Sequence, residues 1–353
     1  MKRIPSLDGF RAISILLVLF CHSRLCAGFP AAMTDIAKQC EVGVTVFFVI
    51  SGFLITNLLL SENSETGSIN IKAFYIRRAL RIIPVYGLYV VFILLWQNIE
   101  HFGLTASNYF HVFTFTVNFD RQKDWFLGHF WSLSVEEQFY LFWPAFLIIF
   151  KKHLKIVLGA LISYSVIVRV VAYKFPAYEL ITLSPFFIYS DAIFVGAFGG
   201  IIFFEKPELF THKIFSRPAA QIAALIIFLL FVYFTEHGKL AIISLPFGRL
   251  IISSAILFLI AAYIIPSDKI IFKILNHKAV VHIGILSYSI YVWQEFFFVG
   301  QIKDWWRQLP YNMLVIYIVS LTSYYLWEKQ FLKIKKYFQG NKLKPDTTLY
   351  QTP

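Results

Sequence analysis

The chain has 353 residues, of which 58% are hydrophobic and 15% charged, and its mean hydropathy is +0.67. Soluble domains hold about 45–50% apolar residues, so this composition excludes an ordinary soluble protein and indicates a protein of the lipid bilayer. Aromatic residues reach 19%. Many Trp and Tyr stand near the ends of apolar runs, as in the belts that these rings form at the membrane surface.

The first apolar stretch follows a short basic segment, residues 1–6, and contains Asp8, Arg11 and His22. These charges, and the lack of a convincing cleavage site, argue against a removable signal peptide. We therefore expect residues 8–27 to form the first membrane-spanning helix.

Further spans follow from the rule that a transmembrane helix needs about 20 mainly apolar residues. The segment Leu104–Phe119 is apolar but contains Asn108, His111 and Asn118, so we expect a re-entrant or interfacial segment there. The predicted fold is an all-α, polytopic membrane helix bundle. Its spans, about ten, are expected near residues 8–27, 42–60, 82–98, 133–150, 156–173, 183–204, 219–235, 244–265, 281–300 and 312–328.

The orientation follows from Lys and Arg, which are enriched in cytoplasmic loops. With the N-terminus inside, the inner segments hold 21 of the 32 Lys and Arg residues and the outer segments hold 8. Both termini are therefore expected in the cytoplasm. The net charge of +12 reflects this bias, and no nucleic-acid partner is expected. We divide the chain into one membrane domain, residues 1–338, and a polar cytoplasmic tail, residues 339–353.

The three cysteines, Cys21, Cys26 and Cys40, lack the spacing of a metal site, and no metal is expected. Cys26 and Cys40 could pair if both lie in the first outer loop. Alternatively, Cys26 lies four residues after His22 on the same helical face and could be a covalent nucleophile.

Arg11 and His22 are ionisable residues inside a span, where a charge costs about 2.5–3.5 kcal/mol on insertion scales. They are eleven residues apart. Eleven helical steps return to within about 20° of the same direction, about 16 Å further along the axis. Either residue alone could be a snorkelling or interfacial side chain. Their shared face favours a functional pair, with Arg11 near the cytoplasmic mouth and His22 near the outer leaflet.

Two adjacent carboxylates, Glu136 and Glu137, lie in the stretch HFWSLSVEEQFYLFWP at residues 129–144, which opens the fourth predicted span on the side of His22. Ser134 and Glu137 match a capping box, which favours a structural role for Glu137. Glu136 has no such role, and Tyr140, four residues on, shares its face and could donate a hydrogen bond to it.

A basic cluster, FYIRRALRIIP at residues 74–84, lies at the inner end of the third span. Positive-inside bias explains many such clusters, but Arg77 and Arg81 have the i,i+4 spacing that presents two guanidinium groups to a phosphate. A His beside an acid is typical of a general base. These residues indicate a cytoplasmic phosphate-binding mouth and a proton-abstracting site near the outer face, without naming a reaction.

The order of the motifs resembles the acyltransferase-3 family of bacterial membrane O-acyltransferases, from Leu7 to about Tyr337. The motifs are SLDGFRAISILLVLFCHS with Arg11-x10-His22, VFFVISGFLI (46–55), FYIRRALRIIP (74–84), FWSLSVEEQFYLFWP (130–144), SDAIFVGA (190–197), ILSYSIYVWQ (285–294) and YLWEKQFLK (325–333).

The resemblance implies transfer of an acyl group, usually acetyl, from cytoplasmic acyl-CoA to a hydroxyl group at the outer face of the bacterial inner (cytoplasmic) membrane. The acceptor would be a cell-envelope glycan or glycolipid, such as a polysaccharide or lipopolysaccharide. Carried over by position, the roles would be His22 as catalytic base, Arg11 as its partner, Glu136 as the group that orients it, and Arg77, Arg78 and Arg81 as ligands of the CoA phosphates.

Other matching positions concern substrate contacts and structure. Trp131 and Ser132 could donate to the developing oxyanion, whereas Arg169 and Asp191 could form a buried structural ion pair. A helix cap and a packing contact explain Asp8 and Ser51 as well as ligand contact does. Glu328 also matches. The full set of expected substrate-binding residues is Trp131, Ser132, Glu137, Tyr140, Asp8 and Ser51.

Three departures from the family are Gln294 where His is frequent, Glu328-Lys329-Gln330 in place of Glu-Arg-Pro, and Ser190 where Arg often precedes the Asp. Gln294 is the departure that bears on acceptor choice. Some relatives carry an extra hydrolase-like domain outside the membrane, and we expect this chain to act alone or with a separate partner. The alternative function is a transporter of a small anionic or sugar substrate, although the paired halves typical of transporters are not evident.

Overall fold

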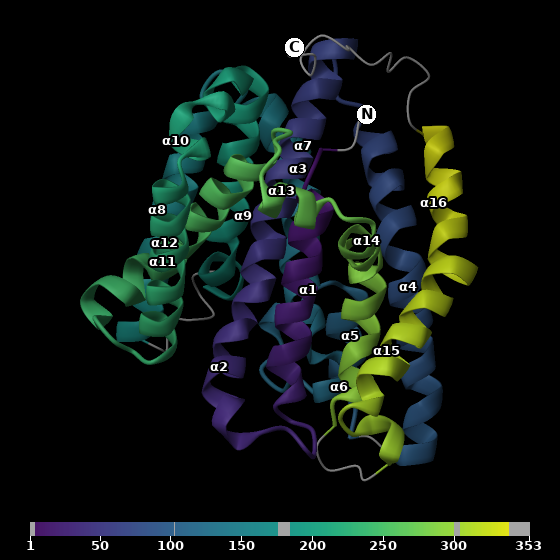
Figure 1. Ribbon diagram of the computed structural model, residues 1–353. Helices are drawn as coiled ribbons and strands as arrows, with labels where there is room; N and C mark the ends of the chain where they lie inside the picture. Colours follow the sequence, from purple (N-terminus) through teal and green to yellow (C-terminus); the bar gives the residue numbers. More distant parts are fainter. Residues whose placement is uncertain (1–3, 102, 176–183, 300–303, 339–353) are drawn as a thin grey trace.

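The computed structural model describes residues 4–101, 103–175, 184–299 and 304–338, and every regular element in these ranges is a helix. This confirms the predicted all-α fold (Figure 1). The long helices are α1 (Leu7–Ser23), α3 (Gly43–Thr66), α4 (Ile71–Glu100), α7 (Phe130–Ile149), α8 (Leu154–Lys174), α9 (Ser184–Glu205), α11 (Pro218–Glu236), α12 (Ala241–Tyr263), α14 (Lys278–Trp293) and α15 (Tyr311–Thr322).

Short helices connect the long ones. α15 continues through a π-helical turn, Ser323–Glu328, into α16 (Lys329–Lys335), and α14 continues into a 3₁₀ turn, Gln294–Phe297. The other short helices are α2 (Thr34–Gln39), α5 (Ala106–Phe113), α6 (Trp125–Gly128), α10 (Lys213–Ser216) and α13 (Ile270–Leu275). With eight residues, α5 is too short to cross a bilayer, so the segment Leu104–Phe119 is not an additional span.

Among the described residues, six helical segments are long and apolar enough to cross a membrane, namely Ala31–Thr66, Ile71–Glu100, Leu154–Lys174, Pro185–Glu205, Pro218–Glu236 and Ala241–Tyr263. Other long helices do not meet this criterion of length and apolar composition. α1 and α14 have 17 and 16 residues, and α7 carries two carboxylates. The number of ten spans therefore stays a prediction, although each predicted segment contains a helix.

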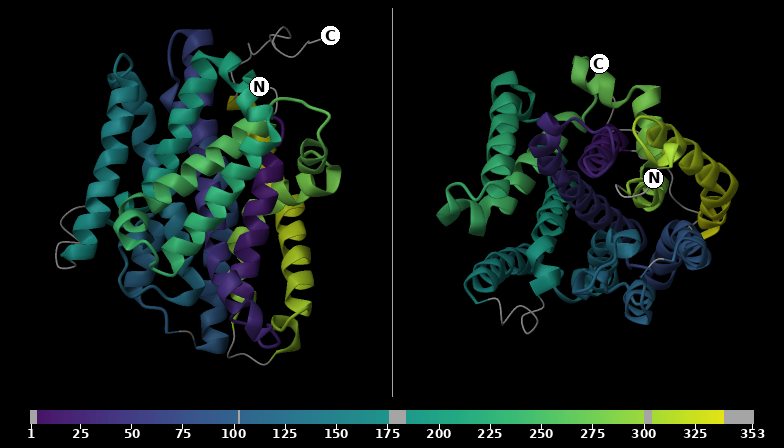
Figure 2. Two further views of the ribbon diagram at one scale, coloured as in Figure 1. Left: turned by 60° about the vertical axis from the view of Figure 1, so that its left-hand side comes forward. Right: turned by 90° about the horizontal axis from the view of Figure 1, so that it is seen from below.

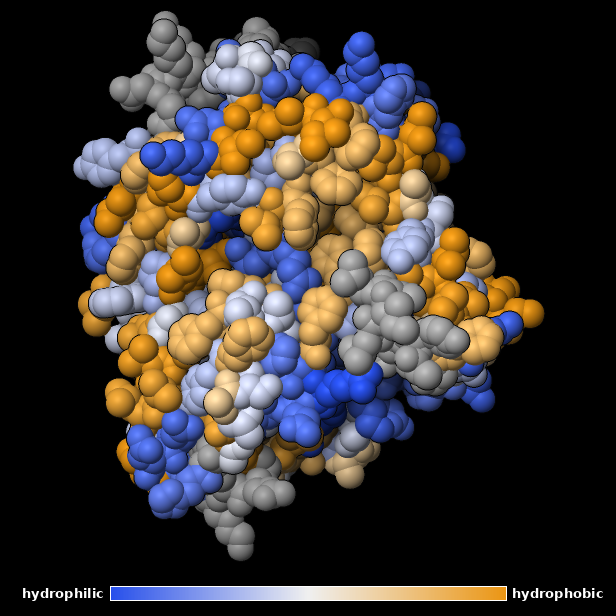
Figure 3. All heavy atoms as spheres, turned by 180° about the vertical axis from the view of Figure 1, so that it is seen from behind, coloured by the Kyte–Doolittle hydropathy of each residue, from blue (hydrophilic) through white to orange (hydrophobic). Residues whose placement is uncertain are grey.

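Apolar side chains cover much of the face seen in Figure 3, as lipid contact requires. The beginning of α1 and the end of α16 lie at the same end of the bundle (Figure 1). The first described helix therefore begins where the last one ends, and the cytoplasmic location of the termini stays a prediction from the Lys and Arg count.

Glycines bring two helix pairs into close contact. A Cβ atom at Gly52 of α3 would collide with the backbone carbonyl of Ile193 in α9, so only glycine permits this approach. In the same way, Gly284 of α14 lies against the backbone of Asp8 in α1. Because α1 packs directly on α14, the later residues of both helices come together. Figure 2 shows the same arrangement from two other directions.

Two expectations about pairing have opposite outcomes. Arg169 donates to Asp191, which is fully buried, and this confirms the structural ion pair. Cys26 and Cys40 are both free thiols, so the disulfide prediction is wrong. Cys26 follows the end of α1 and accepts a hydrogen bond from the Asn312 amide at 3.2 Å, so it does not continue the helical face of His22.

Candidate active site

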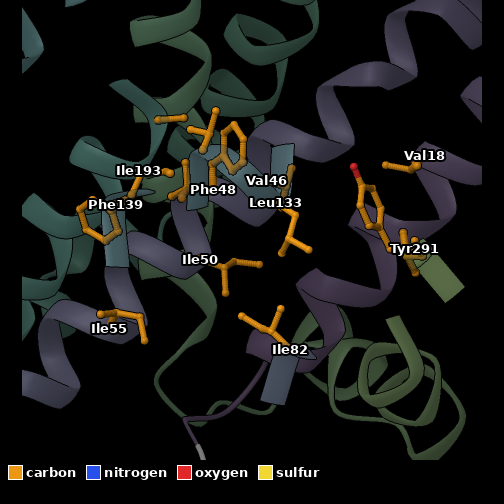
Figure 4. Close-up of a cluster of buried hydrophobic side chains, with 14 of the residues drawn as sticks. Val18, Val46, Phe48, Ile50, Ile55, Ile82, Leu133, Phe139, Ile193 and Tyr291 are labelled. Atoms are coloured by element: carbon orange, nitrogen blue, oxygen red, sulfur yellow. The ribbon is translucent and has the colours of Figure 1, made fainter. Parts of the chain in front are cut away.

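A cavity lies between α1, α3, α4, α7 and α14 and encloses about 730 Å³ of space, part of it open to solvent. Figure 4 shows Ile82, Leu133 and Tyr291, which line it, among neighbouring apolar side chains. The cavity brings together seven of the residues predicted from the sequence: Arg11, Ser51, Arg78, Arg81, Ser132, Glu136 and Tyr140. We call it the donor cavity, because it contains Arg78 and Arg81, which the family resemblance leads us to expect at the phosphates of the acyl donor.

The arginines of the donor cavity differ in their partners. Arg78 lies 5.0 Å above the centre of the Tyr140 ring, and no carboxylate of the described residues is within ion-pair distance of it. Arg81 is bound to the buried carboxylate of Glu328 at 2.5 Å. Arg11 is paired with Asp8 at 3.0 Å, and Asp8 does not line the cavity.

Arg77 lies outside the donor cavity. Its guanidinium is bound to Glu62 of α3 at 2.9 Å and donates to the Phe338 carbonyl at 3.1 Å. The predicted phosphate fork of Arg77 and Arg81 therefore does not face this cavity, because Glu62 holds Arg77 away from it, and phosphate binding by this pair stays a prediction. Arg78 and Arg81 form the pair that faces it.

Glu136 accepts hydrogen bonds from the Ser51 hydroxyl at 3.0 Å and from the Tyr140 hydroxyl at 3.1 Å. The bond from Tyr140 confirms the predicted contact. A direct contact between Glu136 and His22 is not formed. α7 begins at Phe130, so Glu136 lies nearly two turns inside the helix, on the cavity wall with Arg11 rather than beside His22.

The capping box predicted for Ser134 and Glu137 is wrong, because both residues lie inside α7. Ser134 donates to the Phe130 carbonyl at 2.9 Å and accepts from the Val117 amide at 3.2 Å. One carboxylate oxygen of Glu137 is buried without a hydrogen-bond partner among the described residues. Glu137 is close enough to Arg78 to interact with it electrostatically.

His22 lies near the end of α1, against the 3₁₀ turn that follows α14. Its Nδ1 is 2.8 Å from Oε1 of Gln294 and 3.7 Å from Oε1 of Glu295. Both oxygens attract an N–H group, so the proton of the neutral ring belongs on Nδ1 and the lone pair on Nε2. The Trp125 ring packs against the imidazole with its centre 5.5 Å away. Nε2 is thereby the basic nitrogen of the site.

His129 and Glu295 are site residues that the sequence did not predict. Their side chains are buried, and Nδ1 of His129 is 3.1 Å from Oε2 of Glu295. A carboxylate inside the apolar run 281–300 is itself a signal of function and could have identified Glu295. His129, at the start of a span, carries no such signal.

Tyr291 connects the donor cavity with the His22 site. It lines the cavity, and its hydroxyl lies 2.5 Å from the Ser132 hydroxyl and donates to the His129 carbonyl at 2.8 Å. Gln294, the partner of His22, follows three residues later, about 4.5 Å along a helix. The cavity therefore ends about one helical turn from the candidate base.

A second cavity of about 570 Å³ lies between the start of α3, the start of α7 and the facing parts of α11 and α12. Trp131 lines it, so this predicted residue does not face the donor cavity. Val44 and Phe48 line both cavities and form a shared wall. The charged groups of the second cavity are balanced, with two cations and two carboxylates: Lys38, Arg249, Glu41 and Glu236.

Comparisons with known proteins identify the family of this chain. The profile of the acyltransferase-3 family, described as "Acyltransferase domain", matches residues 4–327. A peptidoglycan O-acetyltransferase of Listeria monocytogenes is 35% identical over 168 residues, which are 44% of this chain and 26% of that protein. A Staphylococcus aureus protein named "Putative O-acetyltransferase" is 30% identical over 336 residues, 83% of this chain and 50% of that protein.

A Bacillus subtilis protein named "Putative peptidoglycan O-acetyltransferase" is 28% identical over 329 residues, 83% of this chain and 48% of that protein. This chain thus spans about half the length of the last two relatives. No solved structure matches it significantly. Because the profile covers nearly all of the chain, the protein belongs to the acyltransferase-3 family of acyltransferase domains.

Proposed function

We propose that this protein transfers an acyl group, acetyl in the simplest case, from cytoplasmic acyl-CoA to a hydroxyl group of a cell-envelope glycan or glycolipid at the outer face of the bacterial cytoplasmic membrane. The observation that carries the proposal is the donor cavity, which holds three arginines and ends near His22. The names of the relatives favour acetyl as the group, and two of those names favour peptidoglycan as the kind of acceptor.

The donor cavity suits the phosphates of an acyl-CoA. Guanidinium groups bind phosphates through paired hydrogen bonds, and Arg78 is the cavity arginine whose charge no described carboxylate neutralises at ion-pair distance. Arg81, bound to Glu328, is the second phosphate contact. With the nucleotide part at these residues, the long pantetheine arm can follow α1 from Arg11 toward His22.

His22 acts as the general base. Its Nε2 takes the proton of the acceptor hydroxyl while the hydroxyl oxygen bonds to the acyl carbon. The carbon–sulfur bond of the thioester breaks, and the sulfur leaves as a thiolate that receives the proton from His22. The ring returns to its neutral form, so the cycle needs no other reactant. A positioned base of this kind contributes about 10²–10⁴-fold to the rate.

The second cavity is the proposed site of the acceptor. Its charges cancel, unlike those of the donor cavity, which suits a ligand rich in hydroxyl groups better than a polyanion. Aromatic rings commonly offer an apolar face to a ligand with a polar edge, and Trp131 provides such a face beside Phe48 and Tyr189. Val44 and Phe48 line both cavities, which supports an acceptor site beside the proposed donor site.

The test is acetyl transfer by purified protein in liposomes. Acetyl-CoA is supplied on the cytoplasmic side and chitotetraose, a soluble N-acetylglucosamine oligomer, on the other, and CoA release and O-acetylation are measured for wild type and His22→Ala. Loss of both signals in His22→Ala, with an unchanged unfolding temperature, supports the proposal. Undiminished CoA release by His22→Ala contradicts it. Substrate accumulation in the liposomes without CoA release would identify a transporter instead.

A further inference from the structure

The 3₁₀ turn after α14 places a second acid, Glu295, next to the candidate base. Glu295 is 3% exposed, and the preceding Gln294 is fully buried. Within ion-pair distance, the described partners of Glu295 are His22 and His129. A buried carboxylate is costly unless a cation or several hydrogen bonds compensate it, and these two histidines are the described groups close enough to do so.

His129 is arranged as the compensating cation. Its Nδ1 lies 3.1 Å from Oε2 of Glu295, and its Nε2 lies 3.2 Å from the carbonyl oxygen of Val292. A carbonyl oxygen only accepts hydrogen bonds, and a carboxylate attracts an N–H group. Nδ1 and Oε2 are at ion-pair distance, although neither atom has a hydrogen-bond partner among the described residues. A positive charge on the His129 ring would therefore attract Glu295 electrostatically, with the carbonyl of Val292 as acceptor for Nε2.

Contacts from three helices hold this arrangement. The Trp125 indole donates to the backbone carbonyl of Glu295 at 3.0 Å, and the Tyr291 hydroxyl donates to the backbone carbonyl of His129 at 2.8 Å. The Tyr89 ring stands perpendicular to the His129 ring, with centres 5.6 Å apart. These contacts hold the backbone of Glu295 and His129 and the ring of His129 in position.

The other ionisable groups around this cluster leave the pairing intact. Arg307 is bound to Glu100 at 2.8 Å. Asp124 lies outside the long helices, and burial raises its pKa, with a further contribution from the charge of Glu295. The phenols of Tyr89 and Tyr291 also interact with Glu295 electrostatically.

We propose that Glu295, rather than Glu136, is the positioning carboxylate of His22, and that His129 keeps Glu295 ionised. The inference rests on the proposed function. When His22 takes the proton of the acceptor hydroxyl, the new positive charge lies beside Oε1 of Glu295 and is stabilised there. Glu295 takes no proton itself, and His22 passes its proton to the departing sulfur. Glu136, bound to Ser51 and Tyr140, belongs to the wall of the donor cavity.

The experiment compares Glu295→Gln with Glu136→Gln, two changes that each remove one charge and keep the size of the side chain. For Glu295→Gln we expect kcat to fall about 10²–10⁴-fold, with the KM for acetyl-CoA nearly unchanged. The acid limb of the pH–rate profile should move to lower pH, because an imidazolium without its carboxylate loses its proton more readily. Glu136→Gln should change the rate or the KM for acetyl-CoA and leave the acid limb in place.

Several outcomes separate this inference from the proposed function. If wild type neither releases CoA nor acetylates chitotetraose, the proposed function fails. If wild type is active and Glu295→Gln keeps its rate and its pH profile, the inference is overturned and the function stands. An unfolded Glu295→Gln protein, detected by its melting temperature, shifts the test to Glu295→Asp. That variant should keep the wild-type acid limb at reduced kcat, and a displaced limb would contradict the inference.

Discussion

Oε1 of Gln294 lies 2.8 Å from Nδ1 of His22, although 272 positions separate the two residues in the chain. With Nδ1 donating to this oxygen, Nε2 carries the lone pair that the proposed base needs. Replacing Gln294 by Met, which has a similar volume and no comparable acceptor, should lower kcat about 10–150-fold, the value of a hydrogen bond to a group that becomes charged. The KM for acetyl-CoA should stay unchanged in steady-state assays. Wild-type kcat in Gln294→Met would show that this contact does not position the base.

The second prediction concerns the two neighbouring arginines of α4. Arg78→Gln should raise the KM for acetyl-CoA about 10–100-fold, because a charge-assisted hydrogen bond to phosphate contributes about 1.5–3 kcal/mol. Arg77→Gln is the matched control, since Arg77 is bound to Glu62 outside the cavity, and its KM should change less than about threefold. The measurement is CoA release at varied acetyl-CoA. Equal effects of the two changes would place the phosphates elsewhere.

Much of this architecture could be predicted from the sequence, because it depends on local patterns. The apolar runs predict the helices, and the spacing of Arg11 and His22 places both on one face of a helix that the structure shows unbroken. Composition and residue spacing can be interpreted without knowing which helices are neighbours. Contacts between helices cannot be predicted without that knowledge, and the predictions of such contacts are less accurate.

Glu136 illustrates this limit. The sequence predicts a span that begins at residue 133, but α7 begins at Phe130. Because of this earlier start, the carboxylate of Glu136 lies on the wall of the donor cavity and not at the level of His22. Similarly, the contact of His22 with Gln294 depends on the approach of α1 to α14, which glycine at position 284 permits. A local pattern contains neither piece of information.

The third prediction tests the second cavity. Trp131→Leu removes the aromatic face while keeping the site apolar, and it should raise the KM for chitotetraose about 2–13-fold, since a ring contact contributes about 0.5–1.5 kcal/mol beyond the buried area. The KM for acetyl-CoA should not change, because Trp131 lines the second cavity and does not line the donor cavity. An isothermal titration with chitotetraose provides an independent check. An unchanged KM for chitotetraose would show that the acceptor does not bind in this cavity.

The fourth prediction concerns Cys26. Its thiol is buried against the Asn312 amide, so we expect Cys26→Ala to keep full rates of CoA release and acetyl transfer. The same variant should lose the hydrogen bond and show a slightly lower melting temperature. Acetylated Cys26 trapped by acid quenching and detected by mass spectrometry, together with an inactive Cys26→Ala, would instead establish a covalent route.

The last prediction concerns stability away from the active site. Arg169 of α8 donates to Asp191 of α9 and, at 2.8 Å, to the Pro246 carbonyl of α12, so this pair joins three helices. Asp191→Asn leaves the guanidinium buried without its counter-charge, which costs about 3–5 kcal/mol. We expect a markedly lower melting temperature in detergent and unchanged KM values for the protein that remains folded. Replacing both residues, as Arg169→Met with Asp191→Leu, removes the buried charges together and should restore much of the stability. A double variant as unstable as Asp191→Asn would show that the hydrogen bond to Pro246, rather than charge balance, holds the three helices.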